Sequence, residues 1–239
     1  MLLLTGIIFA EIILLYFITN RLTSVLFTLF IIIFRNKQIA TGILTGLYLP
    51  GTVIHELAHL ITAEVLRVPT GTLSFTPEVT RTTAREHEII AGSVGIGATD
   101  PVRRFLIGFA PVIFGLFFLG LIVWVWNYFW PQLADWRQQT LFIILIGYLL
   151  FAVSNNMFSS HSDLDGSWPL IIFIILITLV FYFMGVRISL SGDVFLFTRI
   201  LLTTLSKALG IVIGVNICLF IINILFLRGL NRIRSNFHR

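Results

Sequence analysis

Long runs without a charged residue dominate the chain and predict membrane-spanning helices. Each run is about long enough to cross a hydrocarbon layer of roughly 30 Å as a helix. A further run, Leu2–Thr19, is interrupted by Glu11, and the short run Leu22–Phe34 fits a tilted span, a re-entrant piece or a continuation of the first helix. The clearest runs contain no Asp, Glu, Lys or Arg: Phe105–Trp130, Thr140–Phe158, Trp168–Val186 and Ala208–Leu227.

The composition of the whole chain indicates a membrane protein. Of 239 residues, 57% are hydrophobic and 11% are charged, whereas soluble domains carry about a quarter charged residues. The length suits roughly six or seven spans of about 20 residues. We therefore predict an all-α polytopic membrane protein with about six or seven transmembrane helices.

The polar stretch that follows the third apolar region has a different pattern. Residues 68–99 are rich in Thr, Gly, Pro and β-branched residues, as in Thr72-Leu-Ser-Phe-Thr76, which favours short strands. We expect a small membrane-associated β segment there. The chain then divides into an N-terminal helical hairpin or kinked helix (1–38), a core (39–168), and two C-terminal transmembrane helices with a basic tail (169–239).

Basic residues give the chain a net charge of +5 but do not indicate nucleic-acid binding. They lie between apolar runs and in the tail, where loop charge orients the spans. This distribution predicts a cytoplasmic C-terminus in a cell inner or plasma membrane. Cys218 is the single cysteine, so any metal site must use His and carboxylate side chains.

The motif His55-Glu56-Leu57-Ala58-His59 carries the candidate chemistry. Residues four apart stand on the same face of a helix, so both imidazoles can reach one metal ion. Glu56 lies beside the first ligand, where it can hold and deprotonate a metal-bound water. Placing an ionisable group near the centre of a span costs at least about 2.5 kcal/mol of free energy. A shared metal ion would explain why three such groups stand within five residues. Pro50-Gly51, one turn earlier, predicts a kink that admits water.

A catalytic zinc ion with three protein ligands needs one more. The candidates are His161, Asp163 and Asp165, in the polar segment between two predicted spans. Glu78 is the rival, because it follows His59 at the spacing of zinc peptidases whose third ligand is Glu. We rank Glu78 lower, because those enzymes place that Glu on a helix and Thr76-Pro77-Glu78 is not helical.

The HExxH on an apolar helix, followed about a hundred residues later by Leu164-Asp165-Gly166, resembles the site-2 protease family of intramembrane zinc metalloproteases. The resemblance covers the chain from about Ile39 to Trp168. It implies one zinc ion per chain, Glu56 as the catalytic base, and a sheet that pairs with an unwound substrate. The ligands that it implies are His55, His59 and Asp165.

The chain departs from the family pattern in one motif. The family has an Asn followed by prolines before Leu-Asp-Gly, whereas this chain has Asn155 and Asn156 and no proline until Pro169. Either Asn can correspond to the family's.

These residues predict a zinc metalloendopeptidase that hydrolyses peptide bonds in transmembrane or membrane-proximal segments of protein substrates. Two alternatives stay open. One is a non-catalytic membrane protein that binds or transports the metal. The other is a membrane-bound zinc protease that acts on peptides at the membrane face, with Glu78 as its ligand.

Overall fold

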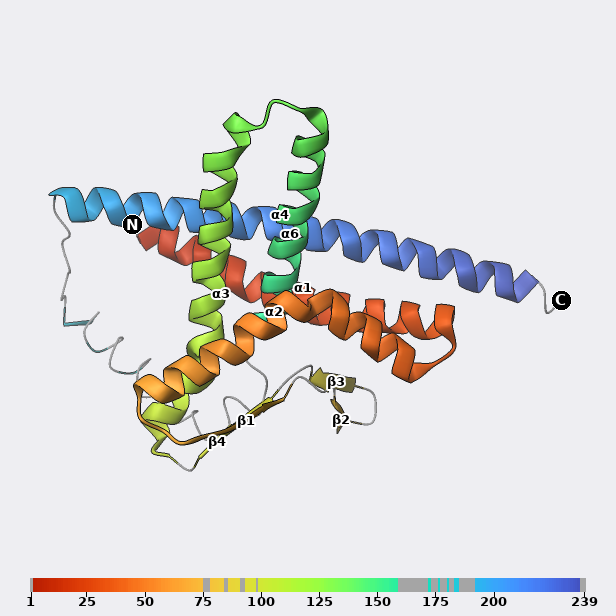
Figure 1. The fold of residues 1–239 in the computed structure, drawn as a ribbon, viewed down its shortest axis with the longest axis horizontal. Coiled ribbons are helices and arrows are strands. Elements are labelled where there is room, and N and C mark those ends of the chain that lie inside the picture. Colours follow the sequence, from red (N-terminus) through yellow and green to blue (C-terminus); the bar gives the residue numbers. More distant parts are fainter. Residues whose placement is uncertain are drawn as a thin grey trace.

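The computed structural model describes residues 2–74, 78–83, 86–90, 93–97, 99–158 and 192–236, together with positions 172, 176, 180, 183 and 184. The chain is predominantly helical (Figure 1). Its helices are α1 (Leu2–Phe34), α2 (Lys37–Val65), α3 (Pro101–Phe129), α4 (Trp136–Asn156) and α6 (Gly192–Asn236), with a 3₁₀ turn η1 at Trp130–Gln132. Its strands are β1 (Thr70–Ser74), β2 (Glu78–Thr83), β3 (Glu86–Ile90) and β4 (Ser93–Ile96).

Helix α1 runs unbroken through both N-terminal apolar runs, so the second run continues the first helix. The chain reverses at Arg35, whose φ of 51° lies in the left-handed region. Asn36 then caps α2, because its side-chain oxygen accepts hydrogen bonds from the backbone N–H groups of Gln38 and Ile39. Helix α2 therefore returns alongside α1 (Figure 1).

The segment between α2 and α3 contains two small antiparallel sheets of two strands each, β1 with β4 and β2 with β3. Gly71 of β1 lies beside Gly95 of β4, where a Cβ atom on Gly71 would be 3.4 Å from the Gly95 Cα atom, an ordinary van der Waals distance. Glu78, the rival third ligand, begins β2.

Helices α3 and α4 form a hairpin that crosses the pair formed by α1 and α6 (Figure 1). Aspartates start both helices of the hairpin, because Asp100 accepts hydrogen bonds from the backbone of Arg103 and Val102, and Asp135 from that of Arg137. The interior where these helices meet is apolar, with Leu15, Leu119, Val153 and Leu209 all buried.

Four helices among the described residues are long and apolar enough to cross a membrane: Leu3–Phe34, Pro101–Gln132, Trp136–Asn156 and Gly192–Gly229. Large apolar side chains on them, such as Phe9, Phe17, Phe117 and Trp124, are exposed, as expected for helices solvated by lipid. The helices are consistent with association with a lipid bilayer. The sequence predicts six or seven spans over the whole chain, and its run Trp168–Val186 falls largely outside the described residues.

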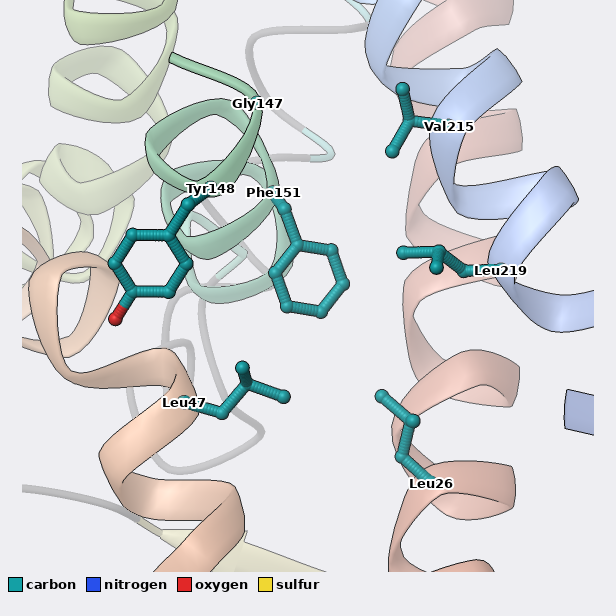
Figure 2. A pocket seen from close by; sticks show the side chains of 7 residues that line it. All are labelled: Leu26, Leu47, Gly147, Tyr148, Phe151, Val215 and Leu219. Atoms are coloured by element: carbon teal, nitrogen blue, oxygen red, sulfur yellow. The ribbon is translucent and has the colours of Figure 1, made fainter. Parts of the chain in front are cut away.

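An apolar cavity of about 340 Å³ lies between α1, α2, α4 and α6. Leu26, Leu47, Phe151 and Leu219 point into it (Figure 2). Neither histidine of the HExxH motif nor Glu56 lines this cavity. The two histidines instead contact α3 and α4.

Candidate metal centre

The contact between α2 and α4 is unusually close. A Cβ atom on Gly51 would lie 2.0 Å from the backbone oxygen of Ala152 and 2.9 Å from Nδ2 of Asn156. Only a glycine at this position allows the two backbones to approach so far. Pro50 precedes it inside α2, where the missing N–H group leaves the Gly46 carbonyl without its helical donor. One turn beyond this contact, α2 presents the HExxH motif.

The two histidines of the motif face each other. Nε2 of His55 and Nε2 of His59 are 3.1 Å apart, and the ring centroids are 4.8 Å apart with an interplanar angle of 77°. His59 is 3% exposed, and His55 is partly buried. The helix thus brings two ring nitrogens to one point, as the spacing of four residues predicts.

The Nδ1 atom of His59 lies 2.9 Å from the backbone oxygen of Ile107 in α3. That oxygen is available because of Pro111, which stands four residues later inside the same helix. A proline has no N–H group, so the carbonyl four residues before it loses its helical partner. The imidazole of His59 supplies the donor that Pro111 cannot.

The Nδ1 atom of His55 lies 2.6 Å from the backbone oxygen of Asn156. Asn156 is the last residue of α4, and the final carbonyls of a helix have no intrahelical donor. The side chain of Asn156 is also held, because its Nδ2 donates to the carbonyl of Ala152 at 3.0 Å and lies 3.4 Å from that of Tyr48. Both histidines are therefore oriented by carbonyl groups that helix geometry leaves without a partner.

These contacts favour the same tautomer in both rings. A carbonyl oxygen only accepts, so hydrogen bonds to the two carbonyls place the ring hydrogen on Nδ1. In the neutral rings, each Nε2 then holds a lone pair, and the two lone pairs converge across 3.1 Å. A bound cation would satisfy both. Two nitrogens at zinc bonding distance in tetrahedral geometry lie about 3.3 to 3.4 Å apart, close to the observed separation, and carbonyl-bonded Nδ1 atoms are the usual outer contacts of such ligands.

Glu56 lies between the two histidines in sequence and is 5% exposed. A carboxylate buried in an apolar bundle is costly without compensating contacts. Its place directly after His55 puts it on the helix that carries both imidazoles. The described donor set thus consists of two oriented imidazoles with a buried carboxylate on the same helix.

Three of the four residues predicted as a third ligand fall outside the described residues, and Glu78 is the exception. His161, Asp163 and Asp165 all lie in the segment that follows α4, of which the structure describes nothing between residues 159 and 171. Within the described part of the chain, no group of three or more His, Cys, Asp or Glu side chains could hold a metal ion. The last residues that the structure describes before that segment follow Asn156, whose backbone oxygen contacts His55.

Three features of the site were not predicted from the sequence. Gly51 was interpreted as part of a kink rather than as the closest contact between α2 and α4. The carbonyl of Asn156 is a backbone group at a helix end, which no side-chain pattern indicates. The carbonyl of Ile107 did have a sequence signal, Pro111, because a proline inside a helix leaves the carbonyl four residues earlier without its helical donor.

Comparison of the chain with protein-family models, with curated proteins and with solved structures finds no match.

Proposed function

We propose that this protein is an intramembrane zinc metalloprotease that hydrolyses peptide bonds in transmembrane or membrane-proximal segments of other proteins. The observation that carries the proposal is the convergence of the His55 and His59 Nε2 atoms at 3.1 Å, with both Nδ1 atoms already engaged by backbone carbonyls. The resemblance of the HExxH and Leu-Asp-Gly motifs to the site-2 protease family adds the reaction type.

His55 and His59 would hold one zinc ion, with Asp165 as the proposed third ligand and His161 or Asp163 as its alternatives. The imidazoles would bind it as neutral rings through Nε2, in the tautomer that the carbonyls of Ile107 and Asn156 favour. Zinc bound there supplies a Lewis acid that polarises the scissile carbonyl and lowers the pKa of a bound water.

Glu56 acts as the general base in this proposal. Its carboxylate takes a proton from the attacking water and then delivers that proton to the leaving amine. Glu56 is 5% exposed and directly follows His55 in α2, so it lies inside the bundle on the helix that carries both proposed ligands. The reaction consumes one water and breaks one C–N bond, which leaves a carboxylate and an amine.

The proposed substrate is an unwound transmembrane segment. A helix in lipid hides its carbonyls in internal hydrogen bonds, so substrates should carry helix-weakening residues near the cut. The strands β1 to β4, which follow the HExxH helix directly, offer backbone edges with which an extended segment can pair. We place this sheet at the membrane surface.

We also propose that α2 and the apolar run Trp168–Val186 add to the four candidate spans and give six in all. With six spans, the strand segment, the loop after α4 and the basic tail share one side of the membrane. The tail's arginines favour the cytoplasmic side of an inner or plasma membrane.

The test is cleavage of a model transmembrane substrate by the purified chain in proteoliposomes, with Glu56→Gln as the matched variant. We expect Glu56→Gln to keep the zinc and to lose activity by a factor of about 10² to 10⁴. Zinc-dependent cleavage at the wild-type rate by Glu56→Gln would overturn the proposal. A zinc flux across the vesicle membrane that survives Glu56→Gln would favour the metal-transport alternative.

A further inference from the structure

We infer that Asn216 of α6 is a positioning residue for the candidate metal centre, acting through Asn155 on the end of α4 that orients His55. Asn216 lies outside the part of the chain that resembles the protease family. The inference rests on the proposed function, because it assigns to α6 a role in holding the ligands of that centre.

The contact that carries the inference joins two buried amides. Nδ2 of Asn155 donates to Oδ1 of Asn216 at 3.2 Å, and Asn216 is completely buried, with 0% exposure. Its neighbours on α6 are apolar, so a buried amide there is costly unless its hydrogen bonds are made. The hydrogen bond to Asn155 repays part of that cost and joins α6 to the last turn of α4.

The end of α4 is held from three sides. Gly51 of α2 admits the carbonyl of Ala152, and Gly115 of α3 admits Met157, since a Cβ atom on Gly115 would lie 2.3 Å from that of Met157. Asn216 of α6 holds Asn155 from the remaining side. These contacts surround Asn156, whose carbonyl oxygen contacts His55 at 2.6 Å.

The contact from α6 differs in kind from the other two. Packing of Gly51 and Gly115 sets how near the helices come, whereas a hydrogen bond is directional. Asn155 and Asn156 are separated by about 100° around the helix axis, so a tie at Asn155 fixes the rotation of the final turn. That turn has no following helical turn to hold it. Its rotation decides where the Asn156 carbonyl lies, and thereby the orientation of the His55 ring.

The two amides at this end of α4 each have one polar atom beyond those in the hydrogen bond that joins them. Oδ1 of Asn155 and Nδ2 of Asn216 have no hydrogen-bond partner among the described residues. Asn155 is nevertheless well anchored, because its Nδ2 also donates to the carbonyl of Phe151 at 2.8 Å. The Asn155–Asn216 bond is thus an additional tie between helices and is not needed to satisfy Asn155 Nδ2.

The experiment measures the zinc dissociation constant of the full-length chain in lipid nanodiscs, by competition with a chelator, for Asn216→Leu and Asn216→Asp. Both side chains match Asn in size, and Asp keeps the accepting oxygen whereas Leu removes it. We expect Asn216→Leu to weaken zinc binding about tenfold, as for other groups that orient a ligand. We expect Asn216→Asp to bind zinc more tightly than Asn216→Leu, because its oxygen still accepts from Asn155, although a carboxyl group at this buried position lowers the stability of the fold.

The matched control is Asn223→Leu on the same helix. Nδ2 of Asn223 donates to the carbonyl of Leu219 within α6, so this change removes a partly buried amide that has its hydrogen bond inside α6, and it should leave zinc affinity unchanged. Visible spectra of the cobalt(II)-loaded proteins provide a second readout, since they report ligand geometry. We expect the bands to shift for Asn216→Leu and not for Asn223→Leu.

Equal zinc affinity and equal cobalt spectra for wild type and Asn216→Leu would overturn the inference. So would equal loss in Asn216→Leu and Asn223→Leu, because the effect would then be general destabilisation of α6. A wild-type chain that binds zinc but cleaves no substrate would overturn the proposed proteolysis alone. A wild-type chain that binds no zinc would overturn both.

Discussion

Two of the places where this apolar bundle holds buried polar atoms are built differently. Where α2 meets α3 and α4, each histidine finds a carbonyl that a proline or a helix end has left free. Between α1 and α6, the carboxylate of Glu11 accepts one hydrogen bond from Ser206 at 3.0 Å. Oε2 of Glu11 has no hydrogen-bond partner in the described part of the chain.

The two places are therefore expected to affect different properties, metal binding at the histidines and stability at Glu11. At the histidines, every backbone contact constrains the direction in which a ring nitrogen points, so a small change there should alter metal binding. The contact between Glu11 and Ser206 joins two long helices whose other contacts are mostly apolar, so its loss should alter stability alone. Three substitutions, Gly51→Ala, Pro111→Ala and Ser206→Ala, test this distinction.

The largest effect is expected from Gly51→Ala. The new methyl group would overlap the Ala152 carbonyl, which forces α2 and α4 apart and costs about 1–3 kcal/mol of unfolding free energy. Separation of the helices also withdraws the Asn156 carbonyl from His55, so zinc binding should fall below detection. Thermal melting and zinc analysis of the detergent-solubilised protein measure both effects.

Gly46→Ala is the matched control for that change. Gly46 lies on the same helix, and a Cβ atom there would meet no heavy atom within 4 Å. Alanine should stabilise α2 by about 1 kcal/mol and leave zinc binding intact. Similar behaviour of the two variants would show that the close contact of α2 with α4 has no bearing on the centre.

Pro111→Ala should weaken zinc binding while strengthening the helix that carries it. The alanine restores an N–H group that competes with His59 for the Ile107 carbonyl. We expect the zinc dissociation constant to rise about tenfold, with an unchanged or higher melting temperature. Chelator competition and thermal melting separate the two quantities, and Pro131→Ala, in the 3₁₀ turn after α3, provides a control. A loss of zinc that merely follows a loss of stability would contradict the account of Pro111.

Ser206→Ala should lower stability without changing zinc binding, the reverse of the result expected for Pro111→Ala. It removes the hydrogen bond to Glu11, and single hydrogen bonds between helices in membranes contribute about 0.6 kcal/mol on average. We expect a slightly lower melting temperature and an unchanged zinc dissociation constant. A marked loss of zinc affinity would show that the α1–α6 contact is coupled to the centre after all.

The smallest effect concerns Asp100, which caps α3 outside the membrane-spanning part. The backbone N–H of Arg103 is the main group that lowers the pKa of this carboxyl below its ordinary value of 3.8. Because the folded pKa is lower than the unfolded one, the cap's contribution is complete above the unfolded pKa and is lost as pH falls through the folded value. Asp100→Asn keeps a capping side chain without the charge. Melting curves recorded between about pH 5 and pH 2 should therefore show a shallower acid loss for Asp100→Asn than for wild type, and identical curves would contradict the assignment.

Much of the helical framework could be predicted from uncharged runs. The runs at 105–130 and 140–158 correspond to α3 and α4, although both helices begin several residues earlier, at the aspartate caps. The run at 208–227 gave no sign that α6 starts at Gly192, because its first turns carry charges that a lipid-based criterion excludes. The continuity of α1 was left open for a similar reason, since Asn20 and Arg21 interrupt the apolar pattern without breaking the helix.

The candidate site was predictable only where side chains define it. The spacing of His55 and His59 predicts a shared metal, and the structure brings their Nε2 atoms together. The partners of their Nδ1 atoms depend on how α3 and α4 pack against α2, which no local pattern records. The contribution of Asn216 depends on a contact across 61 residues, so it emerges only once the helices are assembled.

The central claim is that two oriented imidazoles bind one divalent ion. X-ray absorption at the zinc edge tests it directly, on the purified full-length chain loaded with one equivalent of zinc. The account predicts a spectrum fitted by two imidazole ligands at about 2.0–2.1 Å, with one imidazole lost in His59→Ala. A chain that retains no zinc, or a spectrum fitted by oxygen ligands alone that is unchanged in His59→Ala, would contradict it.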